Sequence, residues 1–286
     1  MLYDNAHQWL EASRKHVLLF GMSGLGKTHL SNMLRASGGW FHYSVDYRIG
    51  TRYMGEYIAD NAKREAMKNP FLRELLMSDS IYIGSNISFD NLTPVSTYLG
   101  KPGNPALGGL AMAQYRARQE QFRLGEIAAL HDTGHFIDRA EDIYGYRNFI
   151  CDTGGSICEW IDPDAGLDDP LLAALHARCL LVWIEGSEAH TQELIRRFDR
   201  APKPMAYQPA FLEATWQEYL CETNKMEDEV DPDDFIRYAY GRALAHRQPL
   251  YRAMARHGVR ITAEEVAGVK DSDDFAELIA TALARA

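Results

Sequence analysis

Residues 16–28 read His16-Val17-Leu18-Leu19-Phe20-Gly21-Met22-Ser23-Gly24-Leu25-Gly26-Lys27-Thr28. The residues before Gly21 form a short apolar run, which is typical of a central parallel strand buried on both faces. The residues from Gly21 to Thr28 fit the pattern G-x-x-x-x-G-K-[ST] in full, and a helix is expected to begin at Lys27. The stretch therefore predicts a strand, a glycine-rich loop and a helix in that order, which is the context in which this pattern binds phosphate.

The glycine-rich loop predicts a nucleotide site on physical grounds. Glycines let the backbone wrap so that successive N–H groups point inward, and the following helix adds the positive end of its dipole. Lys27 is expected to reach the β- and γ-phosphates, and Thr28 to bind Mg²⁺ through its hydroxyl group. The residues assigned to nucleotide binding are Gly21, Met22, Ser23, Gly24, Leu25, Gly26, Lys27, Thr28 and His29. The alternative is a glycine-rich turn with an incidental lysine.

The composition of the chain limits its class. It has 286 residues, a net charge of -10 and 46% hydrophobic residues, which is ordinary for a globular protein with a substantial core. The acidic balance argues against a large nucleic-acid surface, which needs clustered positive charge. No stretch approaches the roughly 18 apolar residues that span a bilayer, and the first residues do not resemble a secretory signal. The cysteines lack metal-binding spacing and are interpreted as reduced thiols of a cytoplasmic protein.

Apolar and amphipathic segments alternate along the chain. Strands are predicted at 16–20, 40–45, 148–152, 179–184 and 259–261. Helices are predicted at 27–35, 52–77 with an interruption at 69–70, 110–130 with an extension toward 140, 170–177, 190–200, 209–221, 234–257 with a break at Pro249, and 272–284. Residues 84–109 are interpreted as a long loop and 224–234 as an acidic linker. Strands that alternate with helices predict an α/β fold with a parallel sheet.

The sequence also discriminates among the classes of protein that share this loop. A GTPase would carry an Asn-Lys-x-Asp signature after a strand, and the chain contains none. An AAA-type or helicase ATPase would usually end an apolar strand in two acidic residues. Here the third strand ends in Asp152, and Thr153, Gly154 and Gly155 follow it. These observations favour a small-molecule kinase.

Further motifs occur in an order that resembles the shikimate kinase and nucleoside monophosphate kinase-like branch of P-loop proteins. Phe122-Arg123-Leu124-Gly125-Glu126 is similar to the F-R-x-x-E of shikimate kinases, and Arg247-Gln248-Pro249-Leu250-Tyr251 is similar to their R-x-P-x-Y. Gly154-Gly155 falls where that family places a glycine triplet. The resemblance implies a five-stranded parallel sheet in the order 2-3-1-4-5, ATP as phosphoryl donor with Mg²⁺, and a lid that carries arginines.

The chain differs from that family in its acceptor region. Ser156 stands in place of the third glycine, and Arg48 stands where a second carboxylate would follow Asp46. The segment between Asp46 and Arg123 is also longer than in that family. We therefore expect a single P-loop kinase-like domain over 1–286, with a helical and loop insertion at 52–110 that reshapes the acceptor site. An enlarged lid region is expected at 201–235.

Two aspartates are candidates because each follows a predicted strand at the edge where open α/β sheets bind ligands. Asp46 is expected to accept a hydrogen bond from the acceptor hydroxyl and to act as a base, with Arg48 and Arg52 as weaker anion-binding candidates. Asp152 is expected to bind Mg²⁺ directly or through water. Turn-forming residues and surface ion pairs are the plain structural alternatives.

The resemblance adds three arginines to the candidate site. It implies that Arg123 binds the acceptor, and Glu126, three residues away on the same helix face, would orient it. It also implies that Arg197 and Arg200, on the helix after the fourth strand, close over the γ-phosphate. A helix-surface ion pair and a solvated basic face are the alternatives.

The combined pattern predicts an ATP-dependent phosphotransferase that moves the γ-phosphate to a small polar acceptor, either hydroxylated or anionic. One alternative is a nucleotide-gated ATPase or regulatory module with a macromolecular partner. A narrower alternative is a nucleoside or nucleotide kinase, for which Tyr43, Tyr47 and Tyr53 offer base-sized surfaces. No membrane or nucleic-acid partner is expected, and the sequence does not predict the acceptor or the oligomeric state.

Overall fold

The computed structural model describes residues 2–286. The chain forms two compact units. The sheet unit contains residues 2–45, Ile127–Pro202 and Arg237–Ala286, and the helical unit contains Asp46–Glu126 and Lys203–Ile236. The segments predicted as insertions, 52–110 and 201–235, lie almost entirely in the helical unit, and the single-domain interpretation stays a prediction.

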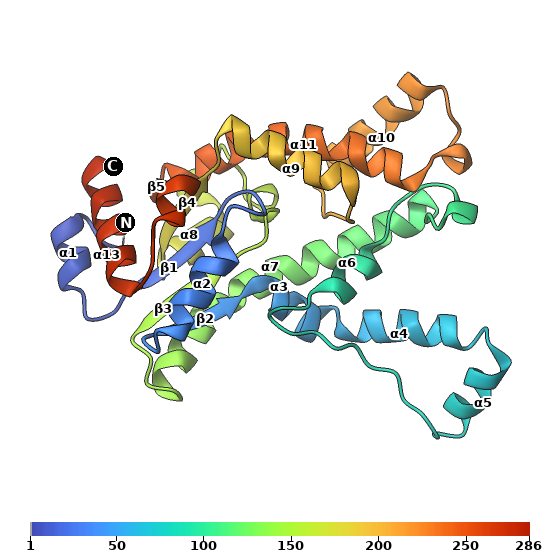
Figure 1. Ribbon diagram of the computed structural model, residues 1–286, viewed down its shortest axis with the longest axis horizontal. Coiled ribbons are helices and arrows are strands. Elements are labelled where there is room, and N and C mark those ends of the chain that lie inside the picture. The colour runs from blue at the N-terminus through green and yellow to red at the C-terminus, as the bar shows by residue number, and fades with distance from the viewer. Residues whose placement is uncertain (1) are drawn as a thin grey trace. The chain divides into compact units, whose positions relative to one another are not determined.

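The sheet unit is built on five parallel strands. They are β1 (His16–Phe20), β2 (Trp40–Ser44), β3 (Asn148–Asp152), β4 (Leu180–Glu185) and β5 (Val259–Thr262). Their order is β2-β3-β1-β4-β5, so that β1 lies at the centre between β3 and β4 (Figure 1). The α/β fold class and this strand order, implied by the resemblance, are confirmed. Val17 to Phe20 are buried completely, as expected of a central strand.

Helices connect the strands and cover both faces of the sheet. They are α1 (Ala6–Glu11), α2 (Lys27–Ala36), α8 (Pro170–His176), α9 (Glu188–Arg200), α12 (Ala263–Ala267) and α13 (Ser272–Arg285), with the later parts of α7 (Met112–Asp142) and α11 (Pro232–Ala255). Short 3-10 helices lie at Ile157–Trp160 and Gly166–Asp168. Tyr43 of β2 stacks on Phe136 of α7 at 4.7 Å, whereas Trp40, on the opposite face, meets Phe275 of α13 at 5.6 Å. Figure 1 shows α13 beside α1, where Trp9 Nε1 donates to the Ala276 carbonyl oxygen.

The helical unit is a separate packing of helices. It contains the end of α3 (Val45–Arg48), the π-helix η1 (Ile49–Tyr53), α4 (Gly55–Ala66), α5 (Pro70–Met77), α6 (Thr93–Leu99) and α10 (Pro209–Thr223). The first part of α7, the start of α11 and 3-10 helices at Pro105–Leu107 and Glu227–Glu229 complete it. Trp216 and Tyr219 of α10 pack edge-on against Phe235 of α11, with ring centroids 4.7 and 5.5 Å apart. This aromatic cluster is part of the core of the unit.

Several predicted boundaries were wrong for identifiable reasons. The second strand ends at Ser44, because Val45 and Asp46 already belong to α3, where an acidic residue in the first turn is favourable. Residues 84–109 are not one loop, because α6 lies within them. Pro94 stands in the first turn of α6, where proline is well tolerated. The segment 224–234 contains a 3-10 helix and the start of α11.

Helix α11 passes through Pro249 without the predicted break. A proline removes one backbone hydrogen bond and favours a kink, but tertiary packing can hold the helix on both sides of it. Tyr251 and Met254, in the turns that follow, are almost completely buried and anchor the end of the helix. Within residues 2–286, no helix combines the length and the apolar character needed to cross a bilayer.

Candidate functional site

The loop between β1 and α2 has the backbone conformation that a phosphate-binding loop requires. Gly21, Gly24 and Gly26 have φ angles of 135°, 86° and 94°, which residues with a side chain rarely adopt. Gly26 is the N-cap of α2, and no side-chain oxygen caps the helix there. The first N–H groups of α2 therefore stand at the positive end of the helix dipole without a side-chain cap, an arrangement suited to an anion.

Neighbouring elements pack closely against this loop and leave no space for a side chain at several of its glycines. A Cβ atom at Gly21 would lie 2.5 Å from the Ile184 carbonyl oxygen of β4, and one at Gly24 would lie 2.7 Å from Leu194 Cδ2 of α9. A Cβ atom at Gly186, just after β4, would lie 3.0 Å from Leu25 Cδ2. The loop is therefore packed against β4 and α9, which fixes its shape before any ligand binds.

Lys27 places a positive charge in this loop. The side chain is buried, and its ammonium group donates to the carbonyl oxygens of Gly21 and Met22 at 2.9 and 2.8 Å. A cation and a set of backbone donors together meet the requirements of a phosphate group. Thr28 and His29 follow in the first turn of α2 and are exposed, so the Thr28 hydroxyl is accessible to a ligand.

Asp152 lies at the same edge of the sheet as this loop. It ends β3, where its Cα pairs with Leu19 of β1 and Ser44 of β2. Its nearly buried carboxylate has Oδ2 3.7 Å from Nε2 of the buried His42 in β2. Thr153 Oγ1 donates to the Leu19 carbonyl oxygen at 2.8 Å, which fixes the turn after β3. Because parallel strands share their carboxyl edge, a carboxylate at this position is suited to a cation that accompanies a bound phosphate.

A buried ion pair supports the turn after β3. Arg247 of α11 and Glu159 of the 3-10 helix Ile157–Trp160 form a salt bridge in which the side chains are 3% and 0% exposed. Burial lowers the pKa of the Arg247 guanidinium, but the interactions with Glu159, Tyr251 and Cys158 together outweigh burial, so the pKa is raised and the guanidinium stays charged. Loss of either partner would leave an uncompensated buried charge.

The same helix also holds the glycine pair. The Tyr251 hydroxyl donates to the Gly155 carbonyl oxygen. A Cβ atom at Gly155 would lie 3.1 Å from Ser23 Oγ, so the turn after β3 packs directly on the phosphate-binding loop. We call the Tyr251–Gly155 hydrogen bond and the Arg247–Glu159 ion pair the α11 clamp. The clamp connects α11 to the turn that contacts the loop.

The two predicted lid arginines lie on α9, the helix that packs over Gly24. Arg197 follows Leu194 by three residues and shares its face of the helix. Its side chain is 67% exposed, and Nε donates to Glu193 Oε1 at 2.9 Å. Arg200 is also exposed, in the last turn of α9. Water and salt screen an exposed ion pair of this kind, so Arg197 would exchange Glu193 for a phosphate at little cost.

Asp46 belongs to the helical unit, two residues after the end of β2. It lies in the first turn of α3, which continues into the π-helix η1, a rare form that occurs frequently at functional sites. Nothing in the sequence signals a π-helix. Arg48 and Arg52 also belong to this unit; the Arg48 guanidinium lies 5.6 Å from the centroid of the Tyr53 ring, and Arg52 is exposed.

Arg123 has a different partner from the predicted Glu126. Its Nε and Nη2 both donate to the Glu120 carboxylate at 2.7 Å, one helical turn before it. The shared hydrogen bonds lower the pKa of Glu120 and raise that of Arg123. Glu126 is completely buried, and Gly125 packs against η1, where a Cβ atom would lie 3.2 Å from Tyr53 Cβ. The F-R-L-G-E segment therefore supports the π-helix as well as carrying an arginine.

The sequence interpretation missed Glu159 and His42 at the edge of the sheet and assigned no individual role to Tyr251. Glu159 belongs to no motif, although it is the first acidic residue after the glycine pair. His42 becomes a neighbour of Asp152 only once β2 and β3 are known to pair. The R-x-P-x-Y segment was recognised only as a family likeness. The contact of its Tyr251 with Gly155 depends on the course of α11 through Pro249.

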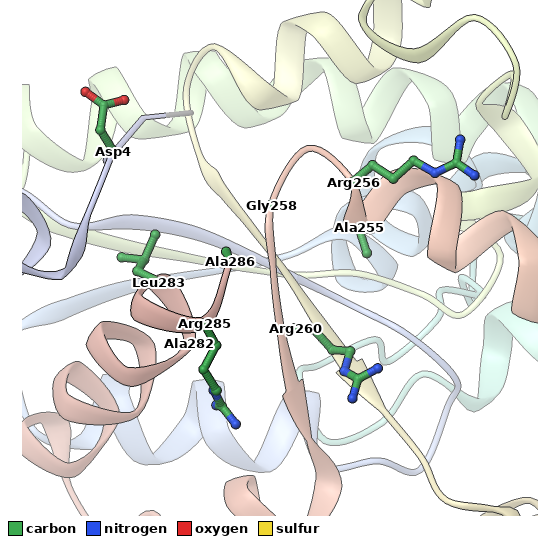
Figure 2. Close-up of a pocket in the computed structure, with 9 residues that line it drawn as sticks. All are labelled: Asp4, Ala255, Arg256, Gly258, Arg260, Ala282, Leu283, Arg285 and Ala286. Carbon is green, nitrogen blue, oxygen red and sulfur yellow. The ribbon is translucent and has the colours of Figure 1, made fainter.

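A second opening in the sheet unit is not part of this site. It has a volume of about 460 Å³ and is lined by the end of α11, the start of β5 and the end of α13 (Figure 2). It contains Arg256, Arg260 and Arg285, but Figure 2 shows that their guanidinium groups point in different directions. Arg260 pairs with Glu185 at 3.1 Å, and Arg285 pairs with Glu265 at 2.9 Å. These arginines do not converge on one anion.

Comparisons with known proteins add little to this description. No known family model matches the chain, and no curated protein matches it. Among solved structures, a 1.7 Å crystal structure of shikimate kinase from Bacteroides thetaiotaomicron is 17% identical, with 96% of each chain covered and a TM-score of 0.35. A likeness at this score carries no argument, so the functional interpretation depends on the residues described above.

Proposed function

We propose that this protein is an ATP-dependent phosphotransferase that transfers the γ-phosphate to a small polar acceptor. The observation that carries the proposal is the G-x-x-x-x-G-K-T loop between β1 and α2, with positive φ at its glycines and the Lys27 ammonium enclosed by loop carbonyls. Asp152 at the same edge supports the binding of a metal–nucleotide complex rather than of a simple anion.

The loop residues fit a triphosphate because Gly21, Gly24 and Gly26 adopt positive φ and the N-terminus of α2 has no side-chain cap. The backbone N–H groups of residues 21–28 would hold the phosphates, and Lys27 would neutralise the β- and γ-phosphate oxygens. Thr28 and Asp152 would hold Mg²⁺, which supplies further neutralisation of phosphate charge. Arg197 and Arg200 would close over the γ-phosphate, with Arg197 leaving Glu193.

In the transfer step, an acceptor hydroxyl oxygen forms a bond to the γ-phosphorus while the bond from that phosphorus to the β–γ bridging oxygen breaks. ADP leaves, and the hydroxyl proton passes to a carboxylate, for which we propose Asp46. Arg123 would hold an anionic or hydroxyl group of the acceptor. Because Arg123 is bidentate to Glu120, that role requires an exchange of partners or a shared site.

The turn after β3 supports transfer to an acceptor over plain hydrolysis. ATPases of the AAA and helicase type place a second acidic residue after the strand-end aspartate, whereas this chain has Thr153 and Gly154. The next carboxylate along the chain, Glu159, is buried in the ion pair with Arg247 and is therefore not accessible to activate a water molecule.

The test is ADP release from Mg-ATP with and without a panel of hydroxylated and anionic metabolites. We expect at least one metabolite to raise ADP release well above basal hydrolysis and to yield a phosphorylated product by mass spectrometry. Asp46→Asn should lower kcat by about 10²-fold or more while ATP affinity changes little. If no compound changes the basal rate of ADP release, the result favours the alternative of a regulatory module. If Asp46→Asn loses turnover and ATP affinity equally, Asp46 is not the base.

A further inference from the structure

The helical unit contains a pocket of about 480 Å³ whose lining carries no ionisable acid or base other than a tyrosine. It lies between α4, α6 and the segment 84–91 that precedes α6. The polar lining consists of amide and hydroxyl side chains, namely Asn61, Ser85, Asn86, Asn91, Thr93 and Thr97. The volume is within the ordinary range for a small-molecule site, roughly 300–1,000 Å³. None of the candidate residues Asp46, Arg48, Arg52 and Arg123 lines it.

The wall formed by the segment 84–91 is anchored in place. Asn91 Nδ2 donates to the Asn86 carbonyl oxygen at 2.8 Å, and the backbones of Ser88 and Asn91 exchange two hydrogen bonds of 3.1 Å. Phe89 stacks on Tyr47 with ring centroids 4.7 Å apart. A pocket with a fixed wall loses less conformational freedom when a ligand binds.

Arg118 of α7 fixes the orientation of one amide in this pocket. Its Nη2 donates to Asn61 Oδ1 at 2.8 Å, and its Nη1 donates to the Tyr98 carbonyl oxygen. An arginine has only donors, so the Asn61 atom that faces it must be the amide oxygen. The Asn61 NH₂ group is then the part of the amide left to donate to a ligand, and Thr97 and Asn86 add a hydroxyl and a second amide.

The lining chemistry selects the class of ligand. A charged ligand would lose hydration without meeting an opposite charge, which is unfavourable. An apolar ligand would leave several amide and hydroxyl groups without partners, which is also costly. A neutral molecule with several hydroxyl groups satisfies the amide and hydroxyl side chains, while Ile58 and Pro94 contact its C–H groups.

A nucleobase fits this lining less well than a sugar. Bases bind through stacking on an exposed aromatic face. The ring of the lining residue Tyr98 is 6% exposed, and the Arg118 guanidinium covers it at 4.6 Å from the centroid. No stacking platform is therefore available on that ring.

We propose that this pocket binds a neutral polyhydroxylated small molecule, a monosaccharide or cyclic polyol. Binding of the ligand does not depend on the proposed function.

The experiment titrates the full chain by protein-observed NMR in the absence of nucleotide. The probes are D-glucose, D-ribose and myo-inositol, with gluconate as an anionic comparison and uridine as a nucleoside comparison. We expect saturable binding of at least one neutral sugar or polyol. Thr97→Val, which keeps the shape of the side chain but removes the hydroxyl group, should weaken that binding about five- to tenfold. Ser96→Ala, on the same helix but outside the lining, is the matched control and should leave binding unchanged.

Absence of saturable binding by all three neutral probes would overturn the proposal, as would tighter binding of gluconate or uridine than of any neutral polyol. Equal binding by wild type and by Thr97→Val and Asn86→Ala would place the ligand elsewhere and also refute it. Lys27→Ala should leave polyol binding intact. If the chain binds a polyol but not Mg-ATP, the proposed function is refuted and the proposal that this pocket binds a polyol is supported.

Discussion

Substitution of Glu159 by glutamine tests the α11 clamp directly. The change keeps the size of the side chain and removes its charge, so Arg247 would remain 97% buried without a counter-charge. Removing one partner of a buried ion pair typically costs about 3–5 kcal/mol of unfolding free energy. With a urea m value of about 3 kcal/mol per M, this corresponds to a fall in the urea midpoint of roughly 1–1.7 M.

The assay is urea unfolding followed by tryptophan fluorescence, for which Trp40 and Trp183 are buried reporters in the sheet unit. The control is Asp138→Asn, which removes the exposed pair between Asp138 and Arg178 and should cost at most about 1 kcal/mol. The double variant Glu159→Met/Arg247→Met removes both charges and should be clearly more stable than Glu159→Gln.

Two outcomes would refute this reasoning. If Glu159→Gln lowers the midpoint no more than Asp138→Asn does, the Arg247 charge is not dependent on Glu159. If the double variant is as unstable as Glu159→Gln, the loss comes from packing volume and not from an unpaired buried charge.

Two further predictions concern the glycine-rich loop and the thiols. Gly24→Ala introduces a side chain at φ 86° and a contact of 2.7 Å with Leu194, so ATP affinity should fall roughly tenfold or more in calorimetry. The control is Gly38→Ala, at φ 82° with no atom within 4 Å of its Cβ, which should lower stability to a similar extent but leave ATP affinity unchanged. An equal loss of ATP affinity in both variants would contradict a local effect at Gly24. Cys221 is exposed and should react with an aromatic disulfide reagent at pH 8. Cys179 should stay unreactive until urea is added, because burial raises the pKa of its thiol to about 12, and reaction in the native state would show that the β4 region opens.

The sequence predicted the sheet well because its signals are local. β1 and β4 are short apolar runs, and the run that ends at Phe20 is followed by a loop pattern that is typical of a strand–loop–helix context. The strand order needed the family likeness, since nothing local in Val259–Thr262 shows that it pairs with β4.

The contacts of the helical unit could not be predicted in the same way, because they depend on how its helices pack. Arg123 has carboxylates at positions 120 and 126, and only the course of α7 decides that Glu120 is the partner. The pocket between α4 and α6 brings together Asn61 and Thr97 from segments that were interpreted as a helix surface and a loop. No residue pattern marks a neutral lining of this kind before the helices are placed.

The central claim is that the β1–α2 loop binds a nucleoside triphosphate through Lys27. Isothermal titration calorimetry with Mg²⁺ and a non-hydrolysable ATP analogue tests it without interference from turnover. We predict saturable binding by the wild-type chain, and a loss of about 2–3 kcal/mol, on the order of 30- to 150-fold, in a folded Lys27→Ala variant. Exposed Lys68→Ala should bind like the wild type. Equal affinities in Lys27→Ala and the wild type, or no binding by the wild type, would contradict the account.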